Sequence, residues 1–338
     1  MTDLLGDDQV RRGADLVQRV RDGLNRTLLG QEELVDSCVI ALCARGHLLL
    51  EGLPGLGKTE LVKALGALLG LDFRRLQFTP DLLPGDITGG PILHEQDGQR
   101  QLQFQPGPLF ANVVLADEIN RASPKTQSAL LEAMQERRVT VLGETHTLPD
   151  PFFVLATQNP IELEGTYPLP EAQLDRFLFK VEVPGVDSGV MAQILMDRRR
   201  GAPPAQGVAL TAEELVELFA CVDAIFLPPA VANYSARLVA ATHPSGQECP
   251  AAMKEAVRFG ASPRAAIAIA EAARAAALLA GRPNVDFADV QRVAVPALAH
   301  RLVLQHQAQL AGATARQLVA ELEEQLPVVG KPLPEVVQ

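Results

Sequence analysis

Two short stretches of the chain carry the residue types that bind a nucleotide and cleave its terminal phosphate. The first is Gly52-Leu53-Pro54-Gly55-Leu56-Gly57-Lys58-Thr59, a glycine-rich loop that ends in lysine and threonine. In this pattern backbone N–H groups surround the polyphosphate, the lysine contacts the β- and γ-phosphates, and the hydroxyl binds Mg²⁺. The sequence therefore predicts ATP and Mg²⁺ as ligands. The predicted nucleotide-binding residues are Gly52, Pro54, Gly55, Gly57, Lys58, Thr59 and Glu60.

The second stretch is a pair of carboxylates, Asp117 and Glu118, directly after the apolar run of residues 113–116. Such a run predicts a buried strand, and parallel α/β sheets place their ligands at the carboxyl ends of the strands. We expect Asp117 to hold Mg²⁺ together with Thr59, and Glu118 to polarise the attacking water. An Asp-Glu pair alone is also compatible with a surface turn. The assignment therefore depends on the glycine-rich loop at residues 52–59 and on the apolar run directly before the pair.

The residues around the glycine-rich loop predict the elements that must position it. Residues 47–51 are a short apolar run typical of a buried strand, and residues 60–70 place leucines and alanines on one face of a helix. The order is therefore strand, loop, helix. A helix N-terminus in this position favours bound phosphate, because its free N–H groups and its dipole both attract negative charge.

A further strand is predicted at residues 153–157, and the polar pair Gln158-Asn159 follows it. An amide at a strand end beside the γ-phosphate can orient the attacking water without titrating, so Asn159 is the candidate for that role. The spacing alone is equally typical of a turn-forming asparagine before proline.

The rest of the N-terminal half predicts an α/β domain with two inserted hairpins. Helices are expected at residues 10–28, 32–43 and 123–136, a strand at 73–78, and mostly loop at 79–90. The hairpins are expected at residues 91–104 and 139–148, where alternating strands flank a glycine-containing turn.

The C-terminal half becomes alanine-rich and helical after a break at residues 183–188. A bundle is the expected outcome, with Thr211 and Glu214 forming a capping box and Pro296 kinking or splitting the last long helix. Arg264 lies in the first turn of a predicted helix, where a cation opposes the helix dipole. On sequence alone it is either a surface arginine or a functional one.

Composition limits the class of protein. The chain has 338 residues, of which 47% are hydrophobic, and a net charge of −11, which disfavours a strongly basic surface for nucleic acid. No apolar stretch is long enough to span a membrane and no leader is recognisable, so we expect a cytoplasmic protein. The 4 cysteines have no metal-ligand spacing, and we expect reduced thiols with Cys38 and Cys43 buried in a helix.

Five blocks, in order, resemble the MoxR family of AAA+ ATPases. The resemblance extends from about residue 29 to about residue 304. It rests on the glycine-rich loop at 52–59, DEINRA at 117–122, KTQSALLEAM at 125–134, ATQNP at 156–160 and LPEAQLDRF at 169–177. It implies a parallel-sheet ATPase core with N-terminal helices at residues 1–183, a linker and connecting helix at 184–208, an α-helical lid at 209–325 and a tail at 326–338.

The resemblance also implies roles for single residues and for partners. Asn159 becomes the first sensor, Arg176 the arginine finger that reaches a neighbouring subunit, and Arg264 the sensor of the lid. The family implies a ring, expected to be a homohexamer, that acts as a chaperone on a protein client, with a separate partner that carries a von Willebrand A domain. The hairpins would project towards the face or pore of the ring.

Two other classes share parts of this pattern. A nucleic-acid motor has the same ATPase core and hairpin insertions, and a signalling switch binds nucleotide without a motor stroke. The acidic balance disfavours the motor, while an arginine finger and a lid sensor disfavour a monomeric switch.

Overall fold

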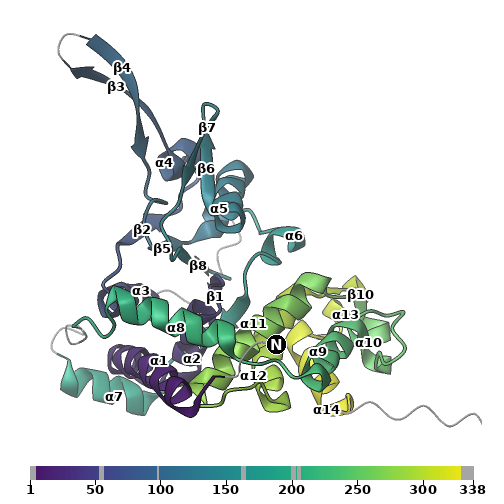
Figure 1. Cartoon of the computed structure of the whole chain (residues 1–338). Helices are drawn as coiled ribbons and strands as arrows, with labels where there is room; N and C mark the ends of the chain where they lie inside the picture. Colours follow the sequence, from purple (N-terminus) through teal and green to yellow (C-terminus); the bar gives the residue numbers. More distant parts are fainter. Residues whose placement is uncertain are drawn as a thin grey trace, which may run out of the picture. The chain divides into compact units, whose positions relative to one another are not determined.

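The computed structural model describes residues 5–52, 57–96, 99–160, 165–198, 203 and 207–328 (Figure 1). These residues form two compact units. We call Asp15–Leu218 the sheet unit, and Met1–Ala14 with Phe219–Gln338 the helical unit. The domain boundaries expected from the sequence stay predictions, and most of the expected tail, residues 329–338, lies outside the described residues.

A parallel five-stranded sheet is the centre of the sheet unit, with the order β2-β5-β8-β1-β9. This confirms the predicted α/β fold. Its strands are β1 (Leu48–Glu51), β2 (Phe73–Gln77), β5 (Val113–Asp117), β8 (Phe153–Gln158) and β9 (Phe179–Glu182). The last of these is a strand that the sequence did not predict.

Burial explains which runs became central strands. In β1, β5 and β8 consecutive residues such as Leu48, Leu49 and Leu50 are fully buried, as expected for strands covered on both faces. The edge strand β2 instead buries Leu76 and exposes the polar side chains around it. The polar residues of these segments therefore lie at the carboxyl ends of the buried strands, with Asp117 at the end of β5 and Gln158 at the end of β8.

The sheet unit also contains helices that precede, connect and follow its strands. Apolar residues of the first helix, among them Leu16, Val20 and Leu24, are fully buried as its spacing predicted. The helix after β5 begins where expected, because Ser123 caps it and proline occupies its first position. The helices are α1 (Asp7–Thr27), α2 (Glu32–Cys43), α3 (Lys58–Leu69), α4 (Pro84–Thr88), η1 (Ile119–Arg121), α5 (Pro124–Glu136), α6 (Glu171–Leu174) and α7 (Ser188–Asp197).

Both predicted hairpins are present. The longer one pairs β3 (Gly89–Gln96) with β4 (Gln99–Pro106) and stands away from the sheet, and the shorter one pairs β6 (Arg138–Val141) with β7 (Glu144–Thr147) (Figure 1). Near the base of the longer hairpin, the ring of Phe104 stacks on that of His146 from β7, with centroids 3.7 Å apart. The two insertions are therefore in direct contact.

The helical unit is a bundle in which the alanine-rich α11 packs against α12, and alanines of α11 such as Ala272 and Ala276 are fully buried. The Thr211–Glu214 capping box forms at the start of α8 (Ala212–Ala224), which crosses from the sheet unit into this one. The other elements are α9 (Pro229–Ala241), α10 (Ala251–Ala256), β10 (Val257–Phe259), α11 (Pro263–Leu279), α12 (Phe287–Leu298), η3 (Ala299–Arg301), β11 (Val303–Leu304), α13 (His306–Leu310) and α14 (Ala315–Gln325).

Two helices differ in part from the sequence prediction, whereas the cysteines agree with it. Helix α12 continues through Pro296 to Leu298, so it is not split there. Residues 84–88 form a short helix inside the segment expected to be mostly loop. All four cysteines are free and buried, as predicted for Cys38 and Cys43. Among the described residues, no helix is long and apolar enough to cross a membrane.

Candidate active site

The described end of the glycine-rich loop is Gly57, which adopts a left-handed conformation with φ of 81° immediately before α3. Glycine is required here on two counts, because this φ is unfavourable for other residues and a Cβ would lie 2.7 Å from Leu28 Cδ2. Residues 53–56, which include the predicted ligands Pro54 and Gly55, lie outside the described residues. After them, Gly57 makes the turn into the N-terminus of α3.

Lys58 is the first residue of α3, and its Nζ donates a hydrogen bond to the Gly52 carbonyl oxygen at 2.5 Å. The side chain therefore reaches back to Gly52. Burial lowers its pKa from the usual value, while the carboxylates Asp117, Glu118 and Glu51 oppose that shift. A partly desolvated ammonium among carboxylates suits a site that receives a polyanion together with a metal ion.

Asp117 ends β5, and Glu118 follows it with a left-handed φ of 56°. That conformation is uncommon for a residue with a side chain and is often found at functional sites. Thr157 in β8 fixes both residues: its hydroxyl donates to Asp117 Oδ1 at 2.6 Å and accepts the Glu118 backbone N–H at 2.8 Å. The two carboxylates are thus held at the strand end predicted for them.

A cavity of about 370 Å³ brings the predicted residues together. Its walls are Gly52, Gly57, Lys58, Thr59, Glu60, Arg75, Asp117, Glu118, Thr157, Gln158 and Asn159. Thr59 offers a hydroxyl and Asp117 a carboxylate, and such hard oxygen donors fit Mg²⁺. Asn159 lies just beyond β8, as its position in the sequence required. This cavity can accommodate phosphate groups beside a cation, and Glu118 and Asn159 are among its walls.

Several residues of this site were missed in the sequence. Thr157 and Gln158 close β8, while Arg75 and Gln77 come from β2. Gln77 and Arg121 each donate to Glu118 Oε2, at 2.8 and 3.0 Å. The alternation of residues 73–78 indicated that Arg75 and Gln77 lie on the same face of a strand. It did not indicate that this strand pairs with β5, which carries Asp117.

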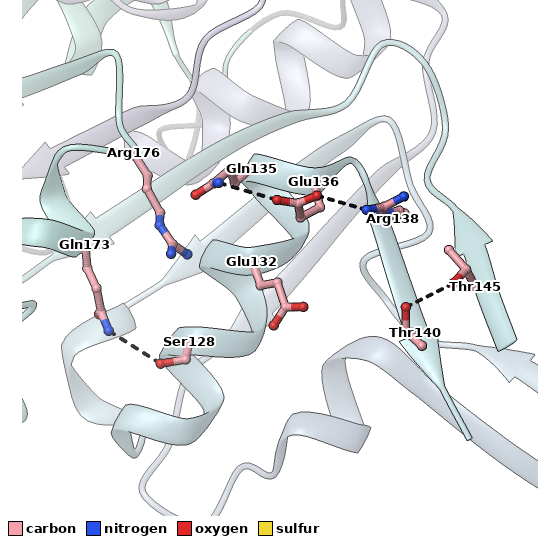
Figure 2. A pocket seen from close by; sticks show the side chains of 9 residues that line it. All are labelled: Ser128, Glu132, Gln135, Glu136, Arg138, Thr140, Thr145, Gln173 and Arg176. Atoms are coloured by element: carbon pink, nitrogen blue, oxygen red, sulfur yellow. Dashed lines mark hydrogen bonds and ion pairs between the residues drawn. The ribbon is translucent and has the colours of Figure 1, made fainter. Parts of the chain in front are cut away.

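Arg176 lies at a different place, in a cavity of about 540 Å³ between α5, the β6–β7 hairpin and the segment after α6 (Figure 2). Its side chain extends towards the face of α5 that carries Ser128 and Glu132 (Figure 2). The Arg176 Nε is buried and has no hydrogen-bond partner among the described residues. Among the described residues that form the walls of the Lys58 cavity, Arg176 is not included.

Arg264 belongs to the helical unit, in the first turn of α11 after the N-cap Ser262. Its side chain is exposed. The helix begins as the Ser-Pro pair predicted, whereas the proposed role as a lid sensor stays a prediction.

Two family models match the chain in the expected places. Residues 47–179 match the ATPase family associated with various cellular activities (AAA), and residues 250–322 match the AAA lid domain. The first match contains every residue that forms the walls of the cavity described above. The second match contains Arg264.

Whole-chain comparisons agree with these matches. The chain is 45% identical to Chaperone MoxR1 of Mycobacterium tuberculosis, over 84% of this chain and 75% of that protein. It is 32% identical to Protein MoxR of Methylorubrum extorquens, over 89% and 91% of the two chains. The crystal structure of a candidate ATPase from Cytophaga hutchinsonii superposes with a TM-score of 0.87 at 36% identity, covering 96% of this chain and 98% of that one. The chain therefore belongs to the MoxR family of AAA ATPases.

Proposed function

We propose that this ATPase is a ring-forming chaperone that uses Mg²⁺ and ATP to remodel a protein client. The observation that supports the proposal most directly is the single cavity that contains Lys58, Thr59, Asp117, Glu118 and Asn159. These side chains supply the positive charge, the oxygen ligands, the base and the water-orienting amide that phosphoryl transfer to water requires.

Each residue has a separate task in hydrolysis. With nucleotide bound, Lys58 would exchange its bond to the Gly52 carbonyl for the β- and γ-phosphate oxygens, and Thr59 and Asp117 would hold the metal. Mg²⁺ would supply neutralisation of the phosphate charge. Glu118 accepts a proton from the attacking water, and Asn159 orients that water through its amide. Gly52, Pro54, Gly55, Gly57 and Glu60 complete the nucleotide-binding set.

Two arginines extend the site beyond one subunit's phosphate loop. Arg176 serves as the arginine finger of a neighbouring subunit. This role is consistent with its position in a separate cavity and with its Nε, which has no hydrogen-bond partner in the described part of the chain. Arg264 serves as the sensor in the lid. A finger acting between subunits requires a head-to-tail contact between copies of the chain, and we propose that these contacts close into a homohexameric ring.

The client and the partner are proteins in this proposal. A relative that is 45% identical is named a chaperone, and the net charge of −11 does not favour a nucleic-acid track. We propose that a separate protein with a von Willebrand A domain works with this ATPase in the cytoplasm, and that the two hairpins contact it or the client. Neither hairpin contributes a wall to the nucleotide cavity.

Two variants test the assignment of the site. Lys58→Ala should abolish nucleotide binding, because it removes the cation that neutralises the phosphates. Glu118→Gln should keep Mg²⁺-dependent ATP binding and lose turnover, because only proton acceptance is removed. Binding is measured with a fluorescent ATP analogue and turnover by phosphate release, with Lys63→Ala as a matched control on the exposed face of the same helix. Turnover of Glu118→Gln at the wild-type rate would contradict the assignment of the base.

A further inference from the structure

The end of α9 holds the short connection that leads into α11. This connection, residues 260–262, runs from β10 to the helix whose first turn carries Arg264. Thr242, the C-cap residue of α9, and His243 are hydrogen-bonded to it. All of these residues belong to the helical unit, and Thr242 and His243 lie outside residues 250–322, which match the AAA lid domain.

Both backbone polar groups of Ala261 are bonded to side chains at this helix end. The Ala261 N–H donates to Thr242 Oγ1 at 2.9 Å, and the Ala261 carbonyl oxygen lies 2.9 Å from His243 Nε2. Because a carbonyl oxygen only accepts, the imidazole nitrogen is the donor of the second bond. Ala261 is fully buried, so these two bonds replace the water that its backbone groups would otherwise bind.

Thr242 is itself fixed, and the connection packs closely against it. Its hydroxyl is buried and donates to the Val239 carbonyl oxygen at 2.6 Å while it accepts from the connection. A Cβ at Gly260 would lie 2.7 Å from Thr242 Oγ1 and 2.8 Å from the His243 backbone nitrogen. Glycine is therefore required at this position, because the two segments approach each other too closely for a side chain.

The chain between Ala261 and Arg264 has little conformational freedom. Ser262 is extended, with φ of −73° and ψ of 165°, as the residue before a proline prefers. Pro263 has a fixed φ and begins α11, in which the Ala265 N–H donates to the Ser262 carbonyl oxygen. The position of Ala261 therefore determines where the first turn of α11 begins and from where the exposed Arg264 side chain extends.

We propose that Thr242 and His243 are positioning residues, which hold Arg264 where it can sense the nucleotide bound to this ATPase. The proposal rests on the role of Arg264 as the lid sensor proposed above. Neither residue touches the nucleotide, because both act through the backbone of Ala261. Loss of either bond would leave a buried polar group of Ala261 without its partner, and the first turn of α11 would shift to recover one.

The first test measures binding of a fluorescent, non-hydrolysable ATP analogue to the full-length chain in the presence of Mg²⁺. Thr242→Val keeps the shape of the side chain and removes both of its hydrogen bonds. It should weaken analogue binding about tenfold or more, the scale of one lost hydrogen bond to a charged group. Thr242→Ser restores the hydroxyl and should bind like the wild type. Ser235→Ala is the matched control, because it removes a buried hydroxyl that is bonded within α9, to the Val231 carbonyl oxygen.

A second pair of variants tests the other bond. His243→Phe keeps an aromatic ring and loses the nitrogen that donates to Ala261, whereas His243→Gln supplies an amide donor in its place. The first should weaken analogue binding and the second should bind nearly like the wild type. Melting curves establish that each variant is folded. Because His243 is exposed, this pair carries the test if Thr242→Val does not fold.

A double-mutant cycle with Arg264→Ala separates positioning from stability. If Thr242 acts through Arg264, Thr242→Val should weaken analogue binding in the wild-type background and change it less than about twofold in the Arg264→Ala background. A defect in packing alone would appear in both backgrounds. The kcat for ATP, measured by phosphate release, should show the same non-additivity.

The outcomes distinguish this proposal from the one on which it rests. If Arg264→Ala binds the analogue and hydrolyses ATP like the wild type, the role of Arg264 as lid sensor is wrong and this inference fails with it. If Arg264→Ala is impaired but Thr242→Val and His243→Phe behave like Ser235→Ala, only the positioning role is overturned. An equal loss with Thr242→Val in both backgrounds would also overturn it, because the effect would not pass through Arg264.

Discussion

The Thr157 hydroxyl donates to Asp117 Oδ1 at 2.6 Å and connects the ends of two neighbouring strands at the candidate active site. The same oxygen accepts the Glu118 backbone N–H. Thr157→Val preserves the shape of the side chain and removes both bonds. We expect a loss of roughly 1–3 kcal/mol in the free energy of unfolding, since two polar groups lose their partner, and weaker Mg²⁺-dependent nucleotide binding.

Thr157→Ser is the matched control, because it keeps the hydroxyl while losing a methyl group. Urea denaturation and the nucleotide titration are measured for both variants. If Thr157→Val binds Mg²⁺ and nucleotide as well as Thr157→Ser does, the hydroxyl has no part in holding Asp117.

The proposed trans role of Arg176 predicts complementation between inactive variants. Arg176→Ala and Lys58→Ala should each lose ATPase activity, since an arginine finger contributes about 10³ to 10⁵ in rate in related systems. Mixing them should restore part of the activity, because some interfaces then join an intact finger to an intact phosphate loop. Phosphate release is measured after subunit exchange, and Arg138→Ala, from the same cavity, is the control.

Assembly has to be followed in the same samples by sedimentation velocity. A mixture that forms rings and exchanges subunits, yet stays inactive, would show that Arg176 does not act between subunits. Activity of Arg176→Ala alone at the wild-type rate would exclude it as the finger altogether.

The longer hairpin exposes a cross-strand pair of leucines, Leu93 and Leu102, which are 61% and 69% exposed. Contiguous exposed apolar surface marks sites of protein contact, and we expect this pair to belong to such a site. The double variant Leu93→Ser/Leu102→Ser should keep basal ATPase activity and ring assembly, and lose stimulation by an unfolded reference protein. Basal and stimulated phosphate release are measured side by side.

The shorter hairpin supplies the comparison, because Leu142 at its turn is 78% exposed. Loss of stimulation in Leu142→Ser alone would assign the contact to that hairpin. Replacing each hairpin by a Gly-Ser turn extends the test, and unchanged stimulation in both shortened chains would reject the hairpins as the coupling surface.

The buried side chain of His47 should make the stability of the sheet unit sensitive to acid. The ring is fully buried: its Nε2 lies 3.2 Å from the Met134 carbonyl oxygen, and its Nδ1 accepts the Val154 N–H at 3.1 Å. Burial, followed by the charge of Arg137, lowers the pKa of His47 from 6.5 to about 3, against the opposing effect of the Met134 carbonyl. The folded protein therefore requires a neutral imidazole.

The lowered pKa determines whether the free energy of unfolding rises or falls with pH. Below pH 6.5 the unfolded chain binds a proton at His47 that the folded chain does not bind until about pH 3. Stability from this group is complete above pH 6.5 and falls through that window, by at most about 1.4 kcal/mol per pH unit. His47→Gln should be less stable at neutral pH but should show a shallower loss between pH 6.5 and 4 in urea denaturation. His306→Gln, at an exposed position, should keep the wild-type slope.

Much of the nucleotide site was predictable because its signals are local. The glycine spacing before Lys58, the apolar run before Asp117 and the strand before Asn159 each specify an element and the residue at its end. The Thr211–Glu214 capping box and the two hairpins were predicted for the same reason: a few neighbouring residues determine them.

The sequence alone thus determined which residues stand at strand and helix ends, since backbone preference and burial pattern act over a few residues. Only the tertiary structure decided the strand order β2-β5-β8-β1-β9, because any apolar strand can pair with several others. That order places Thr157 beside Asp117, and Arg75 and Gln77 on the other side of the same strand end. Their roles depend on contacts between segments about 40 residues apart, and no spacing in the chain encodes such contacts.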